Sequence, residues 1–183
     1  MIYKTYIING SGESGKDKFI EFIKQYIKVN NIQDYLIYND STVDQIRYFL
    51  NDLDLHEKTD EWRNAMGKIK NICESLDENV FNRDMFSKVY NRITFRNDFN
   101  KISFIHCREP ENIEKIKQMF QNNQMHCETI LIKRKEVYNK FSCEKDSLDF
   151  ISNYDYDHII ENNDLEEFRC KAIGFFDIII NKN

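Results

Sequence analysis

The chain has 183 residues, a length that suits one domain. Because 41% of the residues are hydrophobic and 31% are charged, the composition allows a packed core and argues against intrinsic disorder. Its 31 acidic and 26 basic residues give a formal net charge of −5, so we expect no nucleic-acid polymer as a partner. No apolar run has the length of a membrane span, and Met1 leads directly into a strand-like segment instead of a signal peptide. We therefore expect a cytosolic protein without a membrane partner.

The first predicted elements are a strand, a glycine-rich loop and a helix. Residues 3–9 form a largely apolar segment that is typical of a buried strand. Three of the five glycines follow it, at positions 10, 12 and 15. Apolar residues then recur at helical spacing from about residue 16 to residue 29, which predicts an amphipathic helix.

The loop reads GSGESGKD, and Gly10 and Gly15 bracket four residues ahead of Lys16. This spacing lets backbone N–H groups curl around an anion, while the helix adds its positive dipole end and the lysine reaches the β- and γ-phosphates. The position between a strand and a helix favours nucleotide binding over a bare glycine turn. We expect the nucleotide to contact Gly10, Gly12, Glu13, Ser14, Gly15, Lys16, Asp17 and Lys18.

Asp17 stands where the usual phosphate-binding loop has Ser or Thr, whose hydroxyl contacts Mg²⁺. A carboxylate is also a hard oxygen donor, so Asp17 can hold Mg²⁺ directly or through water. The alternative is that Asp17 only caps the helix, because acidic residues are favourable in a first turn.

The remaining chain alternates between apolar segments of strand length and amphipathic helical patterns. Ser41 is expected to cap the helix that contains Val43 and Leu50, and Pro110 fits the start of a later helix. The predicted strands lie at residues 35–38, 101–107, 129–133 and 157–160, and the predicted helices at residues 43–50, 59–76, 82–96, 111–120 and 165–180.

Alternation of this kind predicts an α/β fold with a parallel sheet that helices cover on both faces. Ligands of such sheets gather at the carboxyl ends of the strands. The glycine loop follows the first strand, and the other predicted strand ends carry Asn39-Asp40-Ser41, Arg108-Glu109 and Lys133-Arg134. We expect the functional site at this edge.

Five scattered cysteines without a Cys-x-x-Cys pair predict reduced thiols. The dipeptides His106-Cys107 and His126-Cys127 raise the alternative of a zinc site. Adjacent strand residues point to opposite faces, however, so ordinary packing and loop roles are the preferred interpretation.

An ordered set of segments resembles the P-loop deoxynucleoside monophosphate kinases of phages and bacteria, in which Gly-Lys-Asp replaces Gly-Lys-Ser/Thr. The segments are GSGESGKD, STVDQIR, RNAMGKIK, HCREPENIEKIK, LIKR and SNYDYDHIIENNDLEEFRCKA. The resemblance implies a three-layer P-loop kinase fold with a five-stranded parallel sheet over residues 1–183. It also implies a helical acceptor-binding insertion at about 41–100, a lid at about 134–153, and ATP- and Mg²⁺-dependent phosphorylation of a (deoxy)nucleoside monophosphate.

The same resemblance assigns roles around the transferred phosphoryl group. Lys16 is catalytic, and Arg134 resembles a lid arginine, with a solvated cation at the strand end as the alternative. Arg108 would stabilise the transfer and grip the acceptor phosphate, unless it only pairs with Glu109 or a neighbouring glutamate. Glu109 would supply a second Mg²⁺ contact beside Asp17.

Ser41 and Arg63 would lie in the acceptor region, although Ser41 as a plain helix cap and Arg63 as a solvated helix residue stay open. Arg134 is the one arginine of the lid segment, so the enzyme is expected to be slow or to take an unusual acceptor. Two further functions stay open: a kinase of another small phosphorylated metabolite, since phosphomevalonate kinases share the Gly-Lys-Asp loop, and a nucleotide-binding regulatory module. The sequence leaves open whether the chain forms a homodimer.

Overall fold

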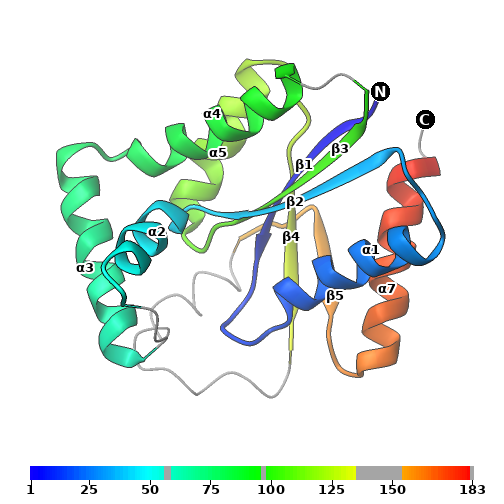
Figure 1. The fold of residues 1–183 in the computed structure, drawn as a ribbon, viewed down its shortest axis with the longest axis horizontal. Coiled ribbons are helices and arrows are strands. Elements are labelled where there is room, and N and C mark those ends of the chain that lie inside the picture. Colours follow the sequence, from blue (N-terminus) through cyan, green and yellow to red (C-terminus); the bar gives the residue numbers. More distant parts are fainter. Residues whose placement is uncertain (56–58, 96–97, 135–153, 182–183) are drawn as a thin grey trace.

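The computed structural model describes residues 1–55, 59–95, 98–134 and 154–181 (Figure 1). The described chain alternates between strands and helices, as the sequence predicts. Its elements are β1 (Tyr3–Asn9), α1 (Lys16–Val29), β2 (Tyr35–Ser41), α2 (Asp44–Asp52), α3 (Asp60–Leu76), α4 (Val80–Phe95), β3 (Asn100–His106), α5 (Pro110–Asn122), β4 (Glu128–Lys133), β5 (His158–Glu161) and α7 (Leu165–Asn181).

The five strands of the described chain form one sheet in the order β2-β3-β1-β4-β5, and each neighbouring pair is parallel. The predicted α/β class and the five-stranded parallel sheet are therefore confirmed. β1 lies at the centre, with Ile7 paired to Ile105 of β3 and to Thr129 of β4. The glycine loop after β1 consequently lies at the middle of the carboxyl edge.

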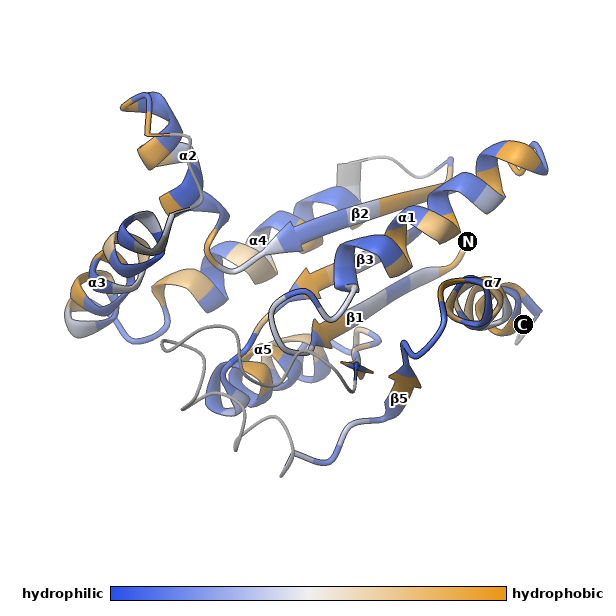
Figure 2. Cartoon of the chain, turned by 90° about the horizontal axis from the view of Figure 1, so that it is seen from below, coloured by the Kyte–Doolittle hydropathy of each residue, from blue (hydrophilic) through white to orange (hydrophobic). Residues whose placement is uncertain are grey.

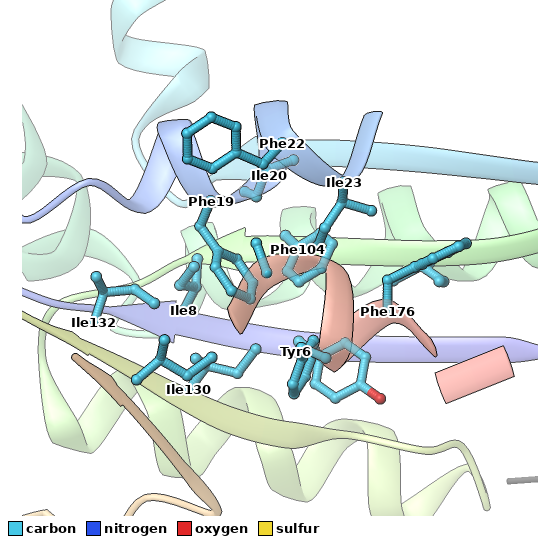
Figure 3. Close-up of a cluster of buried hydrophobic side chains, with 14 of the residues drawn as sticks. Tyr6, Ile8, Phe19, Ile20, Phe22, Ile23, Phe104, Ile130, Ile132 and Phe176 are labelled. Carbon is cyan, nitrogen blue, oxygen red and sulfur yellow. The ribbon is translucent and has the colours of Figure 1, made fainter. Parts of the chain in front are cut away.

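One face of the sheet is covered by α1 and α7 (Figure 1). Alternate residues of β1 point to this face, and Tyr6 and Ile8 pack there with Phe19 of α1 and Phe176 of α7 (Figure 3). Full burial of large apolar side chains contributes roughly 1.5–3 kcal/mol each, so this core anchors α1 against the sheet. The loop that precedes α1 is thereby held on a rigid base.

The opposite face is covered by α4 and α5. Ile7 of β1 and Ile105 of β3 point to this face and pack with Met85 of α4 and with Ile116 and Phe120 of α5. The chain thus forms three layers, two of helices around one of strands.

α2 and α3 lie beyond the edge of the sheet rather than over a face, as both Figure 1 and Figure 2 show. They have a core of their own, in which Ile46 and Leu50 of α2 pack with Trp62 and Met66 of α3 and with Phe81 of α4. Residues 41–100, for which an acceptor-binding insertion is predicted, contain α2, α3 and α4, and α4 also covers the sheet. Over the described residues, no helix combines the length and the apolar character of a membrane span.

The predicted role of Ser41 as a helix cap is wrong. β2 extends to Ser41, which pairs with His106 of β3, and α2 begins only at Asp44 with Val43 at its N-cap. The backbone N–H of Ser41 donates to Oδ2 of Asp44 at 2.7 Å, so the carboxylate of Asp44 closes this turn. Pro110, in contrast, begins α5 as predicted.

Candidate functional site

The glycine loop connects β1 to α1 and requires glycine at two positions. Gly10 has φ 148° and Gly15 has φ 102°, both in the region that L side chains rarely adopt. A Cβ atom at Gly10 would lie 2.5 Å from the carbonyl oxygen of Ile132, and one at Gly15 would lie 2.5 Å from Nδ2 of Asn162. The loop is therefore packed closely against the ends of β4 and β5.

Lys16 is the first residue of α1, and its side chain folds back over the loop. Its ammonium donates to the carbonyl oxygens of Gly10 at 2.7 Å and Ser11 at 2.8 Å. The N-cap of α1 is Gly15, which has no side chain to cap the first turn. A fixed positive charge and the positive end of a helix dipole therefore meet at one point, which suits an anion such as a phosphate.

Two asparagines hold this loop in place. The amide of Asn162, which follows β5, donates to the carbonyl oxygen of Ser14 at 2.8 Å. Asn9 is fully buried; it donates to the hydroxyl of Tyr156 at 2.7 Å and accepts from the N–H of Gly10 at 2.7 Å. Neither role was predicted from the sequence, although a polar residue at the end of a buried strand is a usable signal.

Asp17 is the second residue of α1, and its side chain is 87% exposed. Its Oδ1 accepts from Nδ2 of Asn39 at 3.1 Å and lies 3.6 Å from Nε2 of His106. Gly15 occupies the N-cap position, so Asp17 is not the N-cap residue, although it lies in the first turn of α1, where a negative charge is favourable. An exposed carboxylate beside a phosphate-type loop fits Mg²⁺ as a hard oxygen donor.

Charges around Asp17 act on its protonation. Partial desolvation by the surrounding protein works to raise the pKa of Asp17, but His106, the hydrogen bond from Asn39 and the Lys16 ammonium together lower that pKa below its usual range. Burial lowers the pKa of His106 to about 4, and nearby cations such as Lys16 act in the same direction. Near neutral pH the site therefore has an ionised carboxylate beside a neutral imidazole.

A small pocket opens next to the loop, between the ends of β2 and β3 and the start of α2. Its lining is polar and comprises Asp17, Asn39, Asp40, Ser41, Asp44, Arg47 and His106. Arg47 projects from α2 and contacts Oδ1 of Asp44 at 3.2 Å. Its place in the site was not predicted from the sequence, although Arg47 lies within the STVDQIR segment.

Asp40 forms the inner wall of this pocket and is paired with two cations of α4. Its carboxylate is 5% exposed, accepts from both Nη atoms of Arg92 and lies 2.8 Å from the ammonium of Lys88. Burial would raise the pKa of Asp40, but these two partners lower it. The pair ties β2 to α4.

The structure brings one of the predicted arginines to the loop and another to the neighbouring end of β3. Arg134, the last described residue of the lid segment, donates from Nη1 to the carbonyl oxygen of Glu13 at 3.4 Å. Arg108 follows β3, is exposed, and contributes to the positive charge around His106. The rest of the predicted lid, residues 135–153, lies outside the described residues.

Other predicted residues lie elsewhere. The Glu109 carboxylate pairs with the ammonium of Lys70 on α3, which lowers the pKa of Glu109 against the effect of its burial. Arg63 is half-buried on α3. Lys18 points along the surface of α1 toward Glu21, at 2.9 Å.

In each His-Cys dipeptide, the cysteine and the histidine lie in different surroundings. Cys107 and Cys127 are buried in the core under α5, whereas His106 lines the pocket and His126 contacts Oε1 of Glu128 at 3.1 Å. Among the described residues, no group of three or more His, Cys, Asp or Glu side chains is arranged to hold a metal ion.

Comparison with solved structures shows which fold carries this site. Thymidylate kinase from Ehrlichia chaffeensis superposes with a TM-score of 0.53 at 12% identity, over 97% of this chain and 99% of that one. APS kinase from Mycobacterium tuberculosis, in complex with AMPPNP and APS, superposes with a TM-score of 0.50 at 12% identity, over 96% of this chain and 98% of that one. The tunicamycin resistance protein of Deinococcus radiodurans gives 0.51 at 7% identity, over 95% of each chain. No protein family model matches the sequence, and a search of curated proteins finds no match.

Each of these superpositions extends over nearly the full length of both compared chains. The chain therefore has the fold of the thymidylate and APS kinases, with its glycine loop between β1 and α1. The P-loop kinase fold that the sequence resemblance implied is confirmed at the level of the architecture.

Proposed function

We propose that this protein transfers the γ-phosphoryl group of ATP to a (deoxy)nucleoside monophosphate and releases ADP and the diphosphate. The observation that carries the proposal is the contact of the Lys16 ammonium with the carbonyl oxygens of Gly10 and Ser11. It holds one positive charge over a glycine loop at the start of a helix, the arrangement that binds the phosphates of a nucleoside triphosphate.

The donor nucleotide would be held by residues 10–18. A bound Mg²⁺ ion would supply positive charge that offsets the charge of the phosphates. The exposed carboxylate of Asp17 is the oxygen donor that we assign to this ion. Glu109 would have to leave Lys70 before it could contact a metal, so its role as a second ligand stays a prediction.

The acceptor phosphate would lie at the mouth of the polar pocket, between the loop and α2. Arg47 and Arg108 would grip it, and the backbone near Ser41 would form the floor. Arg63, on α3, would contact the acceptor farther from the phosphate. This arrangement would bring the acceptor oxygen and the γ-phosphate to the same edge of the sheet.

The transfer breaks the bond from the γ-phosphorus to its bridging oxygen and forms a bond to an oxygen of the acceptor phosphate. That oxygen is already anionic near neutral pH, so the protein has to position the two phosphates and supply positive charge. We assign this charge to Lys16 and Arg108. Arg134, which already contacts the loop at Glu13, would add to it from the lid side.

The likeness in fold to a thymidylate kinase supports this acceptor class, and the APS kinase solved with AMPPNP supports an ATP-type donor. APS, the second ligand of that complex, keeps a kinase of another phosphorylated metabolite as the alternative. A catalytically weak regulatory module that only binds the nucleotide is a further alternative, because Arg134 is the one arginine of the lid segment.

An ADP-release assay with ATP, Mg²⁺ and a panel of acceptors tests the proposal. The panel contains the common ribo- and deoxyribonucleoside monophosphates together with non-nucleotide phosphorylated metabolites. We expect turnover with at least one nucleoside monophosphate and formation of its diphosphate. Turnover only with a non-nucleotide acceptor would replace the proposal by its first alternative, and ATP binding without any turnover would replace it by the second.

A further inference from the structure

Three polar side chains from three different elements form a hydrogen-bonded chain at the loop. Nδ2 of Asn39 donates to Oδ1 of Asp17 at 3.1 Å, and Oδ1 of Asn39 lies 2.7 Å from Nε2 of His106. Asp17 belongs to the first turn of α1, Asn39 to β2, and His106 is the last residue of β3. The chain thus joins the loop helix to two neighbouring strand ends.

The polarity of this chain is fixed by chemistry. An ionised carboxylate only accepts hydrogen bonds, so Asn39 must present its NH₂ group to Asp17 and its oxygen to His106. That oxygen also only accepts, so Nε2 of His106 must carry a hydrogen. A His106 ring with its hydrogen on Nε2 therefore sets the orientation of the amide, and the amide sets the orientation of the carboxylate.

Asn39 and His106, the two residues next to Asp17, belong to the paired strands β2 and β3 of the central sheet. β2 and β3 are paired through Asn39, which is opposite Phe104, and through Ser41, which is opposite His106. The His106 side chain is 15% exposed, so packing restricts its ring, whereas the Asp17 side chain is 87% exposed. Without Asn39, the carboxylate would exchange freely among rotamers at the surface of α1.

We propose that Asn39 and His106 are positioning residues, which hold the Asp17 carboxylate in the orientation that a divalent cation beside the loop requires. This inference rests on the proposed function, since it concerns the metal that accompanies the nucleotide. It goes beyond that function by assigning two side chains that would act on the donor nucleotide through Asp17. In a variant that lacks either side chain, we expect a weaker coupling between metal and nucleotide. Nucleotide binding in the absence of metal should be unchanged.

The test measures the dissociation constant of AMPPNP by calorimetry with and without Mg²⁺, in the wild-type chain and its variants. The metal coupling is the ratio of the metal-free dissociation constant to the constant with Mg²⁺. Measuring it requires no turnover. Asn39→Ala is expected to reduce this ratio roughly fivefold, the size of one net hydrogen bond, and to leave the metal-free constant unchanged. Asn39 is exposed, so this variant should fold.

Gln25→Ala is the matched control, because the Gln25 amide donates to the Glu21 carboxylate at 2.8 Å on the same helix but away from the loop. It should leave the ratio unchanged. His106→Ala should lower the ratio as Asn39→Ala does, and His106→Gln should restore part of it, because a glutamine N–H can still donate to Asn39. Thermal unfolding of each variant checks that the fold is retained.

The outcomes separate the two claims. If Asp17→Ala abolishes the coupling while Asn39→Ala keeps the full wild-type ratio, the positioning role is wrong and the proposed function stands. If wild-type protein does not bind AMPPNP with or without Mg²⁺, the proposed function fails and the positioning role fails with it. A reduced ratio in Asn39→Ala, with partial recovery in His106→Gln relative to His106→Ala, supports both.

Discussion

Asn162 donates from its side-chain amide to the backbone carbonyl oxygen of Ser14, a contact of 2.8 Å between residues 148 positions apart. The backbone N–H of Asn162 donates in turn to the carbonyl oxygen of Lys133 at 2.7 Å. The residue that follows β5 therefore holds the glycine loop against the end of β4. The conformation of the loop depends on β4 and β5 as well as on its own glycines.

Replacing Asn162 should loosen the loop. Asn162→Ala leaves the Ser14 carbonyl without its buried donor, so we expect a loss of about 1–3 kcal/mol in the free energy of unfolding and weaker AMPPNP binding. Urea denaturation and calorimetry measure the two effects. Asn163→Ala, at the exposed neighbouring position, should change neither. Equal nucleotide affinity in Asn162→Ala and wild type would show that the contact does not shape the loop.

The loop glycines should be less tolerant of substitution than glycines in helices. Gly15→Ala places a methyl group 2.5 Å from Nδ2 of Asn162 at a φ of 102°, so we expect a loss of about 1–3 kcal/mol in unfolding free energy. Gly67→Ala, in α3 with no heavy atom within 4 Å of the new methyl, should gain up to ~1 kcal/mol. Thermal unfolding of both variants tests the contrast. A stabilised Gly15→Ala would contradict the strained geometry of the loop.

The buried Asp40 carboxylate should be a large contributor to stability above pH 4. Asp40→Asn leaves Arg92 and Lys88 without their charged partner, so we expect a loss of about 3–5 kcal/mol at pH 7. Asp52→Asn, at an exposed position of α2, is the control and should have little effect.

The same pair predicts a pH dependence with a definite sign. The folded pKa of Asp40 is lowered below its unfolded value of about 3.9, so the contribution is fully present above that value and is lost as the pH falls through the folded pKa. Urea denaturation from pH 7 to pH 3 should show wild type and Asp40→Asn converging in the acid range. A constant difference between them at every pH would rule out this ionisation as the cause.

Arg47 should act on the acceptor and not on the donor. Arg47→Ala removes a cation from the pocket wall, so we expect KM for the nucleoside monophosphate to rise roughly 10- to 100-fold, as for loss of a charged hydrogen bond, with KM for ATP nearly unchanged. Arg83→Ala is the matched control, since Arg83 also pairs with a nearby aspartate, Asp77, on the surface. A rise in KM for ATP alone would move Arg47 to the donor side.

Local sequence signals predicted the part of the fold around α1. The glycine cluster and the helical period of the following apolar residues gave the predicted helix the bounds Lys16–Val29, as the structure has them. β2 was predicted too short because Asn39, Asp40 and Ser41 are polar. The strand continues through these residues because the Asp40 carboxylate pairs with two cations of α4. Asp40 and Arg92 are 52 positions apart, so no local sequence pattern reveals this pair.

The candidate site was predictable in its loop and not in its supports. Gly10, Gly15 and Lys16 follow from spacing alone. The contacts of Asp17 with Asn39 and His106 need the parallel pairing of β2 and β3, which brings residues of distant segments to one edge. The pairing of Glu109 with Lys70 likewise joins two segments that are 39 positions apart in the sequence.

The most direct test of the account is the rate of γ-phosphoryl transfer from ATP to the preferred nucleoside monophosphate, compared between wild type, Lys16→Ala and Lys24→Ala. Lys24 is exposed on the same helix, so Lys24→Ala makes the same charge change away from the loop. We expect Lys16→Ala to keep its fold and to lose roughly 10²–10³-fold in kcat, because a charge contact in the transition state is removed, and Lys24→Ala to retain the wild-type rate. A Lys16→Ala variant that transfers phosphate at the wild-type rate would contradict the account.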